Sequence, residues 1–222
     1  MDAPDATRIK FCGITNLDDA DAAVEAGAWA LGVILWPGSK RRCRTADAAL
    51  IAAAHRRRAE IVGVFVNPTL DHVAVAADEI GLTMLQFHGD EGPSFCAEAG
   101  RRTGCRVIKA ARVQSRAEIQ ALAPFHTDFH LLDTYAEGLP GGTGETFAWE
   151  LARGHGPYRL RVPVILAGGL TADNVAEAIA TVRPYAVDVA SGTESDPGVK
   201  DHDKLRAFAA AVASTQPVAP AG

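Results

Sequence analysis

Residues 8–35 read RIKFCGITNLDDADAAVEAGAWALGVIL, and this stretch holds one complete strand–helix–strand unit. Apolar residues dominate its two ends, which predicts two short strands, and the Ala-rich middle predicts a helix over Leu17–Ala26. Thr15-Asn16 supplies a helix start and Gly27 a helix end. The near-continuous apolar runs are typical of parallel strands that are covered on both faces.

The same unit repeats along the chain. The expected strands are Arg8–Cys12, Ala30–Leu35, Glu60–Val66, Met84–Phe87, Arg106–Ala110, Phe129–Asp133, Pro163–Leu166 and Ala186–Val189. The expected helices are Leu17–Ala26, Thr45–Arg57, Leu70–Ile80, Pro93–Thr103, Arg116–Leu122, Phe147–Gly154, Ala172–Val182 and Asp203–Ala213. Repetition of strand and helix predicts an α/β fold, a closed (βα)8 TIM barrel, which typically takes about 250 residues but can be as short as about 200. The rival is a doubly wound open sheet, whose Gly-x-Gly-x-x-Gly fingerprint is absent after the first strand.

No change of composition and no linker divides the chain. We therefore expect a single barrel domain over residues 1–213. The last residues, 214–222, are small and Pro-rich, which predicts a disordered tail.

The composition limits the classes of partner. Hydrophobic residues make up 48% and charged residues 22%, with a formal net charge of −5 at pH 7. The longest basic run is HRRR at residues 55–58, so we expect no nucleic acid and no membrane as a partner. The sequence does not decide between a monomer and a homodimer.

The four cysteines contain no Cys-x-x-Cys pair, so they suggest neither a zinc site nor a dithiol motif, and we expect no metal. Disulfides stay open at this point. The polar, acidic N-terminal segment does not resemble a secretory signal, which favours a cytoplasmic, reducing environment.

The carboxyl ends of the barrel strands are where we expect the active site. Two polar residues stand out at these ends: Cys12 before Gly13, and Asp133 after the sixth strand. They could act as a base and an acid, since a pocket can shift the pKa of a carboxyl or a thiol. The alternatives are a packed cysteine and an aspartate that caps a turn.

The loops after the seventh and eighth strands carry glycines, at Gly168-Gly169 and Ser191-Gly192. Barrels commonly bind phosphate at these two loops, through backbone N–H groups that approach the anion closely. Each loop taken alone is better explained as an ordinary turn, and it is the occurrence of both loops in these two units that predicts phosphate binding.

Four further side chains follow other strands. Arg41 could receive a carboxylate or lie in a solvated basic loop. Gln86 and His88 lie two residues apart and share one face of a strand. Lys109 could form a Schiff base, or pair with a carboxylate.

Several motifs resemble the phosphoribosylanthranilate isomerase family of tryptophan biosynthesis, in the order of that family. They are KFCGIT, GVFVN, LQFHGDE, LLDT…GGTGETFAW, LAGGLTADNV and VDVASGTESDPGVKDHDKL, and they span about Arg8 to Val212. The resemblance implies a (βα)8 barrel and a cofactor-free Amadori rearrangement. The substrate would be N-(5-phosphoribosyl)anthranilate and the product 1-(2-carboxyphenylamino)-1-deoxyribulose 5-phosphate.

The resemblance also implies roles for individual residues. Cys12 matches the general base and Asp133 the general acid of the family, and Arg41 matches the arginine that binds the anthranilate carboxylate. Gly168-Gly169 and Ser191-Gly192 match the phosphate-binding loops. Gln86 and His88 are expected to contact the substrate.

The chain departs from the family pattern at Glu145 and Ala148 in the sixth loop, and at Ala190 before Ser191-Gly192. Two other functions stay open: a Schiff-base aldolase that uses Lys109, and a sugar-phosphate-binding barrel without turnover.

Overall fold

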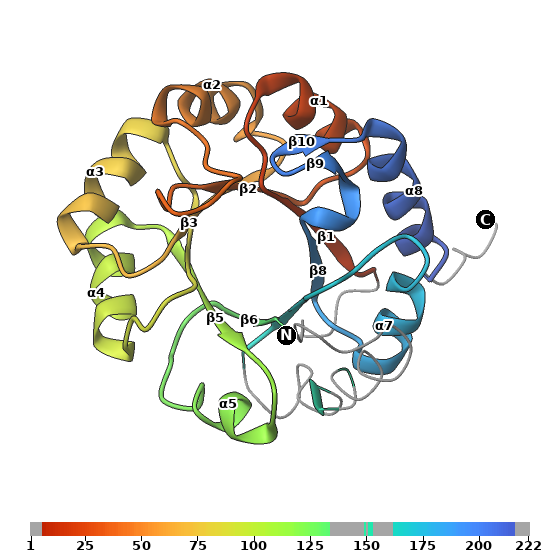
Figure 1. Cartoon of the computed structure of the whole chain (residues 1–222). Helices are drawn as coiled ribbons and strands as arrows, with labels where there is room; N and C mark the ends of the chain where they lie inside the picture. Colours follow the sequence, from red (N-terminus) through yellow and green to blue (C-terminus); the bar gives the residue numbers. More distant parts are fainter. Residues whose placement is uncertain (1–5, 134–148, 150, 153–161, 216–222) are drawn as a thin grey trace, which may run out of the picture.

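The fold is a closed ring of eight parallel strands, seen end-on in Figure 1. The computed structural model describes residues 6–133, 149, 151–152 and 162–215. Each strand pairs with the next in the sequence, and the last pairs with the first, so the sheet has no edge. The strands are β1 (Arg8–Cys12), β2 (Ala30–Ile34), β3 (Glu60–Phe65), β4 (Met84–Phe87), β5 (Arg106–Arg112), β6 (Phe129–Asp133), β7 (Val164–Ala167) and β8 (Ala186–Val189). The barrel prediction is confirmed, and the open sheet was the wrong alternative.

Helices surround the ring on its outside (Figure 1). They are α1 (Leu17–Glu25), α2 (Thr45–His55), α3 (Leu70–Ile80), α4 (Pro93–Thr103), α5 (Arg116–Gln120), α7 (Val175–Val182) and α8 (His202–Ala213). The helix expected over Phe147–Gly154 falls mostly outside the described residues. Within it, only Trp149, Leu151 and Ala152 are described, and all three are helical.

Alternation along the strands divides the barrel into two cores. On β1, Ile9 and Phe11 face the helices, and the Phe11 ring packs edge-on against Phe208 of α8 at a centroid distance of 6.1 Å. Lys10 and Cys12 face the interior of the ring. The interior is filled mainly by Ala30, Val62, Met84, Ile108, Leu131, Ile165 and Ala186. The polar interior residues of β1 therefore stand out against an apolar filling.

Local signals account for most element bounds. Asn16 caps α1 by accepting a 2.8 Å hydrogen bond from the Asp19 amide, and Gly81 ends α3 at a φ of 78°. Helix α7 begins three residues later than expected, because the Asn174 side chain accepts from the Thr171 amide and forms a turn first. Strand β5 continues to Arg112, where it still pairs with Asp133.

A short insertion follows β8 and was not predicted. It consists of a single 3-10 turn at Ser191–Thr193 and a two-stranded hairpin, β9 (Glu194–Asp196) and β10 (Val199–Lys200). We call residues 194–200 the seam hairpin, because it joins the last unit of the barrel to the first. Thr15 donates to the Gly198 carbonyl at 2.6 Å, and the Lys200 amide donates to Asp19 at 3.0 Å.

Two predictions fall on the chain ends. The proposed tail covers 214–222, of which 216–222 lie outside the described residues, and the domain bounds of 1–213 stay a prediction. Over the described part of the chain, no helix is both long and apolar enough to cross a membrane.

Candidate active site

A cavity of about 330 Å³ opens at the carboxyl ends of the strands. It brings together most of the residues that the sequence singled out, from six strand units. Those on its wall are Cys12, Arg41, Gln86, His88, Asp133, Gly168, Gly169 and Ser191. Gly192 follows Ser191 directly in the 3-10 turn. These residues therefore lie at one cavity, and their roles stay predictions.

Cys12 lies at the end of β1 with 6% of its surface exposed. The chain turns away immediately after it: Gly13 has a φ of 78°, and both Gly13 and Ile14 donate their amides to the Gly32 carbonyl. Only glycine adopts that backbone conformation without strain. Burial raises the pKa of the Cys12 thiol above its ordinary value, although Lys10 acts in the opposite direction.

Asp133 faces His88 across the cavity. The His88 Nε2 atom lies 3.5 Å from Asp133 Oδ2, and both side chains are about one-quarter exposed, at 24% and 25%. The Gln86 amide nitrogen lies 3.4 Å from His88 Nδ1. The His88 ring therefore lies between the Gln86 amide, on its Nδ1 side, and the Asp133 carboxyl, on its Nε2 side. His88 is thus placed to orient the carboxyl group.

Gln86 carries an orphaned atom. Its Oε1 is buried and has no hydrogen-bond partner among the described residues, although the side chain lines the cavity. A buried acceptor left in this state costs about 1–3 kcal/mol. A donor group on a bound substrate would remove that cost, which favours the substrate-binding role predicted for Gln86.

Arg41 lies in a largely exposed loop, but its half-buried side chain is held by an ion pair. Its Nε donates to both carboxylate oxygens of Glu194 at 2.9 Å, and its Nη2 lies 2.8 Å from Oε2. Burial raises the pKa of Glu194, but Arg41 and Lys200 outweigh this and hold the pKa below its ordinary value. The charged seam hairpin therefore fixes the guanidinium at the cavity wall.

The two glycine-containing loops meet on one side of the cavity. Gly168 and Gly169 have φ values of 102° and 63°. A Cβ atom added at Gly192 would lie 2.0 Å from the Leu170 carbonyl oxygen. The two loops can therefore be in contact only because Gly192 has no side chain. Their proximity supports a joint anion site rather than two unrelated turns.

Lys109 is engaged elsewhere. Its Nζ lies 2.9 Å from Glu91 Oε2 and donates to the Gly89 carbonyl at 2.6 Å. It lines a neighbouring cavity, lined also by Asn67 and His88, and is absent from the wall of the cavity that holds Cys12. The pairing with a carboxylate, rather than Schiff-base chemistry, is the alternative that the structure supports.

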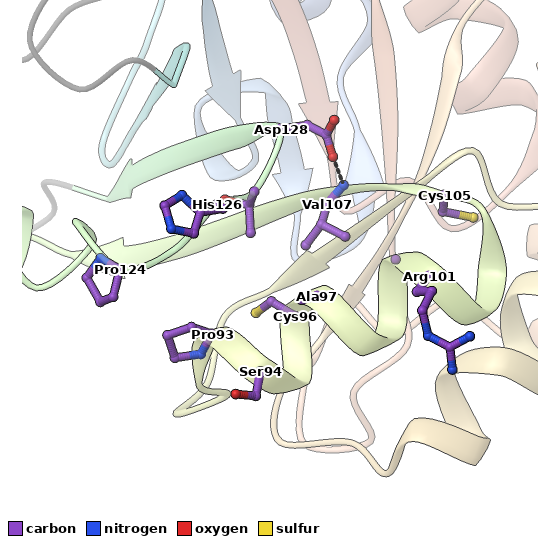
Figure 2. Close-up of a pocket in the computed structure, with 12 residues that line it drawn as sticks. Pro93, Ser94, Cys96, Ala97, Arg101, Cys105, Val107, Pro124, His126 and Asp128 are labelled. Carbon is purple, nitrogen blue, oxygen red and sulfur yellow. Dashed lines mark hydrogen bonds between the residues drawn. The ribbon is translucent and has the colours of Figure 1, made fainter.

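A third cavity, of about 530 Å³, lies outside the ring between α4 and the chain that enters β6 (Figure 2). Cys96 and Arg101 belong to α4, and His126 lies on the opposite wall. Asp128 accepts the Val107 amide at 2.7 Å, which ties this wall to β5. None of the predicted site residues lines it.

All four cysteines are free in the structure. Within the described ranges, no group of three or more His, Cys, Asp or Glu side chains is arranged to hold a metal ion.

Comparison with known proteins decides the family. A family model for N-(5'phosphoribosyl)anthranilate (PRA) isomerase matches residues 9–211. An N-(5'-phosphoribosyl)anthranilate isomerase of Pseudomonas savastanoi pv. phaseolicola is 48% identical over 212 residues, covering 95% of this chain and 99% of that relative. The chain belongs to the phosphoribosylanthranilate isomerase family. The resemblance seen in the sequence is confirmed.

Solved structures of the family have the same fold. The phosphoribosylanthranilate isomerase of Thermotoga maritima superposes with a TM-score of 0.83 at 39% identity, over 94% of this chain and 99% of that one. A second structure of the family, at 37% identity and a TM-score of 0.80, contains reduced 1-(o-carboxyphenylamino)-1-deoxyribulose 5-phosphate and covers 94% of this chain and 99% of that one. The family's reaction is an intramolecular aldose–ketose isomerisation in tryptophan biosynthesis, and this chain is an isomerase of that kind.

Sequence reasoning missed four charged residues: Lys10, Asp188 and Lys200, which act on Cys12, and Glu194, which pairs with Arg41. Lys10 and Asp188 interrupt the apolar pattern of β1 and β8, which was a usable signal. The sequence contains no comparable signal for Glu194 and Lys200, because they lie in the seam hairpin, which was not predicted.

Proposed function

We propose that the cavity at the carboxyl ends of the strands is where this chain carries out the Amadori rearrangement of N-(5-phosphoribosyl)anthranilate. One observation carries this proposal: Cys12 and Asp133, from β1 and β6, line a single cavity together with Arg41 and the two glycine loops. A base, an acid, a carboxylate receptor and a phosphate site are the groups that this substrate needs.

The acid acts first in the proposed mechanism. Asp133 protonates the furanose ring oxygen, the bond from C1 to that oxygen breaks, and the nitrogen lone pair forms an iminium. Cys12, as the thiolate, then removes the proton from C2, and the electrons of that bond give a C1–C2 enolamine. Loss of the hydroxyl proton at C2 and protonation of C1 yield the ketone. Each positioned proton transfer contributes about 10²–10⁴-fold.

The remaining residues hold the two ends of the substrate. Arg41 receives the anthranilate carboxylate with the part of its guanidinium not taken up by Glu194. Backbone groups around Gly168-Gly169 and Ser191-Gly192 receive the phosphate. Gln86 and His88 lie between these ends, where the ribose atoms react, and His88 orients Asp133.

The Schiff-base alternative is disfavoured by the contacts of Lys109, whose ammonium is buried against Glu91. A binding barrel without turnover would keep the cavity but lack the reaction. Neither the unusual Ala190 nor the departures at Glu145 and Ala148, which lie outside the described residues, alters Cys12, Arg41 or Asp133.

The deciding experiment supplies freshly made phosphoribosylanthranilate and follows the loss of anthranilate fluorescence together with chromatographic detection of the ketose. We expect turnover, and no reduced adduct when borohydride is added with substrate. Substrate binding without product would identify a binding protein, and a borohydride-trapped Lys109 adduct would identify the aldolase.

We further propose that the chain acts in the cytoplasm on a small phosphosugar, as a monomer or homodimer and without nucleic acid. The free state of all four cysteines supports a reducing compartment. One structure of a relative, at 36% identity, is described as monomers made from a dimeric isomerase of Thermotoga maritima, which supports testing for a dimer.

A further inference from the structure

Lys10 is a charged residue at the centre of the barrel. Its side chain is fully buried, and its Nζ lies 2.8 Å from Asp188 Oδ1, a carboxylate that is 10% exposed. Lys10 and Asp188 are direct partners in the register of β1 and β8, so the contact is built into the pairing of the first strand with the last. The interior cluster of the ring otherwise consists of apolar side chains.

Stability does not explain this pair. Removing two charges from water costs about as much as their attraction returns, and an apolar pair of similar volume is often as stable or more so. A lysine that interrupts an apolar interior therefore calls for another reason, and the nearest chemistry is at Cys12.

Lys10 and Cys12 point to the same place. They lie two residues apart on β1 and so share the inner face of the strand. A Cβ atom added at Gly32 would lie 2.8 Å from Cys12 Sγ and 3.1 Å from Lys10 Nζ. The missing side chain of Gly32 thus leaves a space that is bordered by both the thiol and the ammonium.

We propose that Lys10 is the counter-ion of the Cys12 thiolate: its buried ammonium, fixed by Asp188, stabilises the ionised form in which Cys12 takes the substrate proton. Lys10 is a positioning residue, because it acts through Cys12. The inference rests on the proposed function, in which Cys12 is the base.

The charge around Cys12 supports this role. Three cationic side chains act on the thiol in the described structure, namely Lys10, Lys200 and Arg41, against one anionic side chain, Asp188. This excess of positive charge favours the thiolate. Glu194 pairs with both Arg41 and Lys200, whereas Lys10 borders the same space beside Gly32 as the thiol does.

The ionisation equilibria agree with this geometry. Burial raises the pKa of Cys12, and Lys10 opposes that effect more strongly than Lys200 does. Burial also lowers the pKa of Lys10, but Asp188 and Cys12 outweigh it, so the ammonium keeps its charge. Without Lys10, the pKa of Cys12 would rise further and the thiolate would become scarcer.

The test measures the ionisation of Cys12 directly. The pH dependence of its alkylation by iodoacetamide, followed by peptide mass mapping, reports its pKa separately from the other cysteines. We expect Lys10→Met to raise this pKa by at least one unit, to cut kcat near neutral pH by about tenfold or more, and to move the rising limb of the pH profile by the same interval.

Lys10→Met leaves Asp188 buried without a partner, and this variant could fail to fold. The double variant Lys10→Met/Asp188→Asn removes both charges and keeps the volume. It should still raise the pKa of Cys12, because Lys10 affects the thiol more than Asp188 does. An unchanged pKa of Cys12 in the folded single or double variant would overturn the proposal, whatever happens to kcat.

Lys109→Met/Glu91→Gln is the matched control, because it removes a buried lysine–carboxylate pair from a barrel strand that does not face Cys12. This control should leave the pKa of Cys12 unchanged. If it shifts the pKa of Cys12 as much as Lys10→Met does, the effect of Lys10 is a general consequence of altered packing. Cys12→Ser separates the two levels of inference. Full activity in Cys12→Ser would refute the base assignment, while the pKa shift caused by Lys10 would still establish the counter-ion.

Discussion

The base proposed for this reaction is a buried thiol, and that proposal predicts a defined dependence of the rate on pH. Because burial raises the pKa of Cys12, the free protein holds mainly the thiol near neutral pH, and the thiolate increases as pH rises. The limb of kcat/KM that Cys12 governs should therefore rise with pH and level off only once the thiol has ionised.

Cys12→Ser tests the base. A serine hydroxyl hardly ionises near neutral pH, so kcat should fall by about two or more powers of ten and the rising limb should disappear. Product affinity should stay within a few-fold, because the exchange of sulfur for oxygen keeps the shape of the site. Steady-state kinetics and product titration measure both quantities. Parental kcat in this variant would remove Cys12 from the mechanism.

Asp133→Asn, compared with Cys12→Ser, separates the acid from the base by reaction step. The asparagine keeps the shape but cannot donate the same acidic proton, so ring opening becomes slow and kcat falls by about two or more powers of ten. A substrate deuterated at C2 should show a larger isotope effect in Cys12→Ser, where proton removal limits the rate. In Asp133→Asn the effect should shrink towards unity, and the reverse order would mean that the two roles are exchanged.

Arg41 offers a test of carboxylate recognition. Arg41→Ala should weaken product binding by about tenfold or more, since hydrogen bonds to charged groups are worth about 1.5–3 kcal/mol. Arg41→Lys keeps the charge but loses the planar fork and should also bind more weakly. The neighbouring exposed Arg42→Ala is the control. If a calorimetric titration shows that Arg41→Ala binds product as tightly as the parent protein, the role of Arg41 is limited to its ion pair with Glu194.

At the scale of elements, the two glycine loops depend on backbone conformation. Gly169→Val puts a branched side chain at a φ of 63° and at the proposed phosphate site, so KM should rise strongly. Gly104→Val introduces comparable strain at a φ of 71°, but on the exposed end of α4, where no atom would meet the new Cβ. Kinetics of the two variants separate strain from phosphate binding, and an unchanged KM in Gly169→Val would reject the phosphate assignment.

Most elements could be predicted because apolar runs of strand length alternate with capped amphipathic helices. Four strands have the predicted bounds, including β1 and β8, and so do α3 and α4. The seam hairpin could not be predicted in this way, because ESDPGVK is short and largely polar and carries no alternation. Its place is set by contacts with distant residues such as Thr15 and Asp19.

At the scale of the whole molecule, the number of units predicts closure, and closure predicts which strand ends share a cavity. Register is not available from the sequence, however. Neither Lys10 nor Asp188 alone indicates an ion pair, which becomes visible only once β1 lies beside β8 with these two residues opposite each other. The candidate site was therefore predicted as a set of residues, without the charges that surround its base.

Asp19 tests how much the seam contributes to the barrel. It accepts from the Lys200 amide at 3.0 Å and contacts His202 at 2.9 Å. Asp19→Ala should lower the free energy of unfolding by about 1–3 kcal/mol, because it leaves a buried donor unsatisfied. Asp18→Ala, at an exposed position of the same helical turn, should have little effect. Urea denaturation compares the two, and equal losses would assign the effect to the helix rather than to the seam.

The seam hairpin also sets the order in which the protein becomes complete. Glu194 is 153 positions further along the chain than Arg41, and Gly198 is 183 positions beyond Thr15. Contacts of such separation form late, after the entropy of closing a very long loop has been overcome. A growing chain on the ribosome therefore has no carboxylate to hold Arg41 until almost all of its residues have been synthesised. The carboxylate site proposed at Arg41 should thus be completed in one of the last events of folding, and an incomplete chain should lack it.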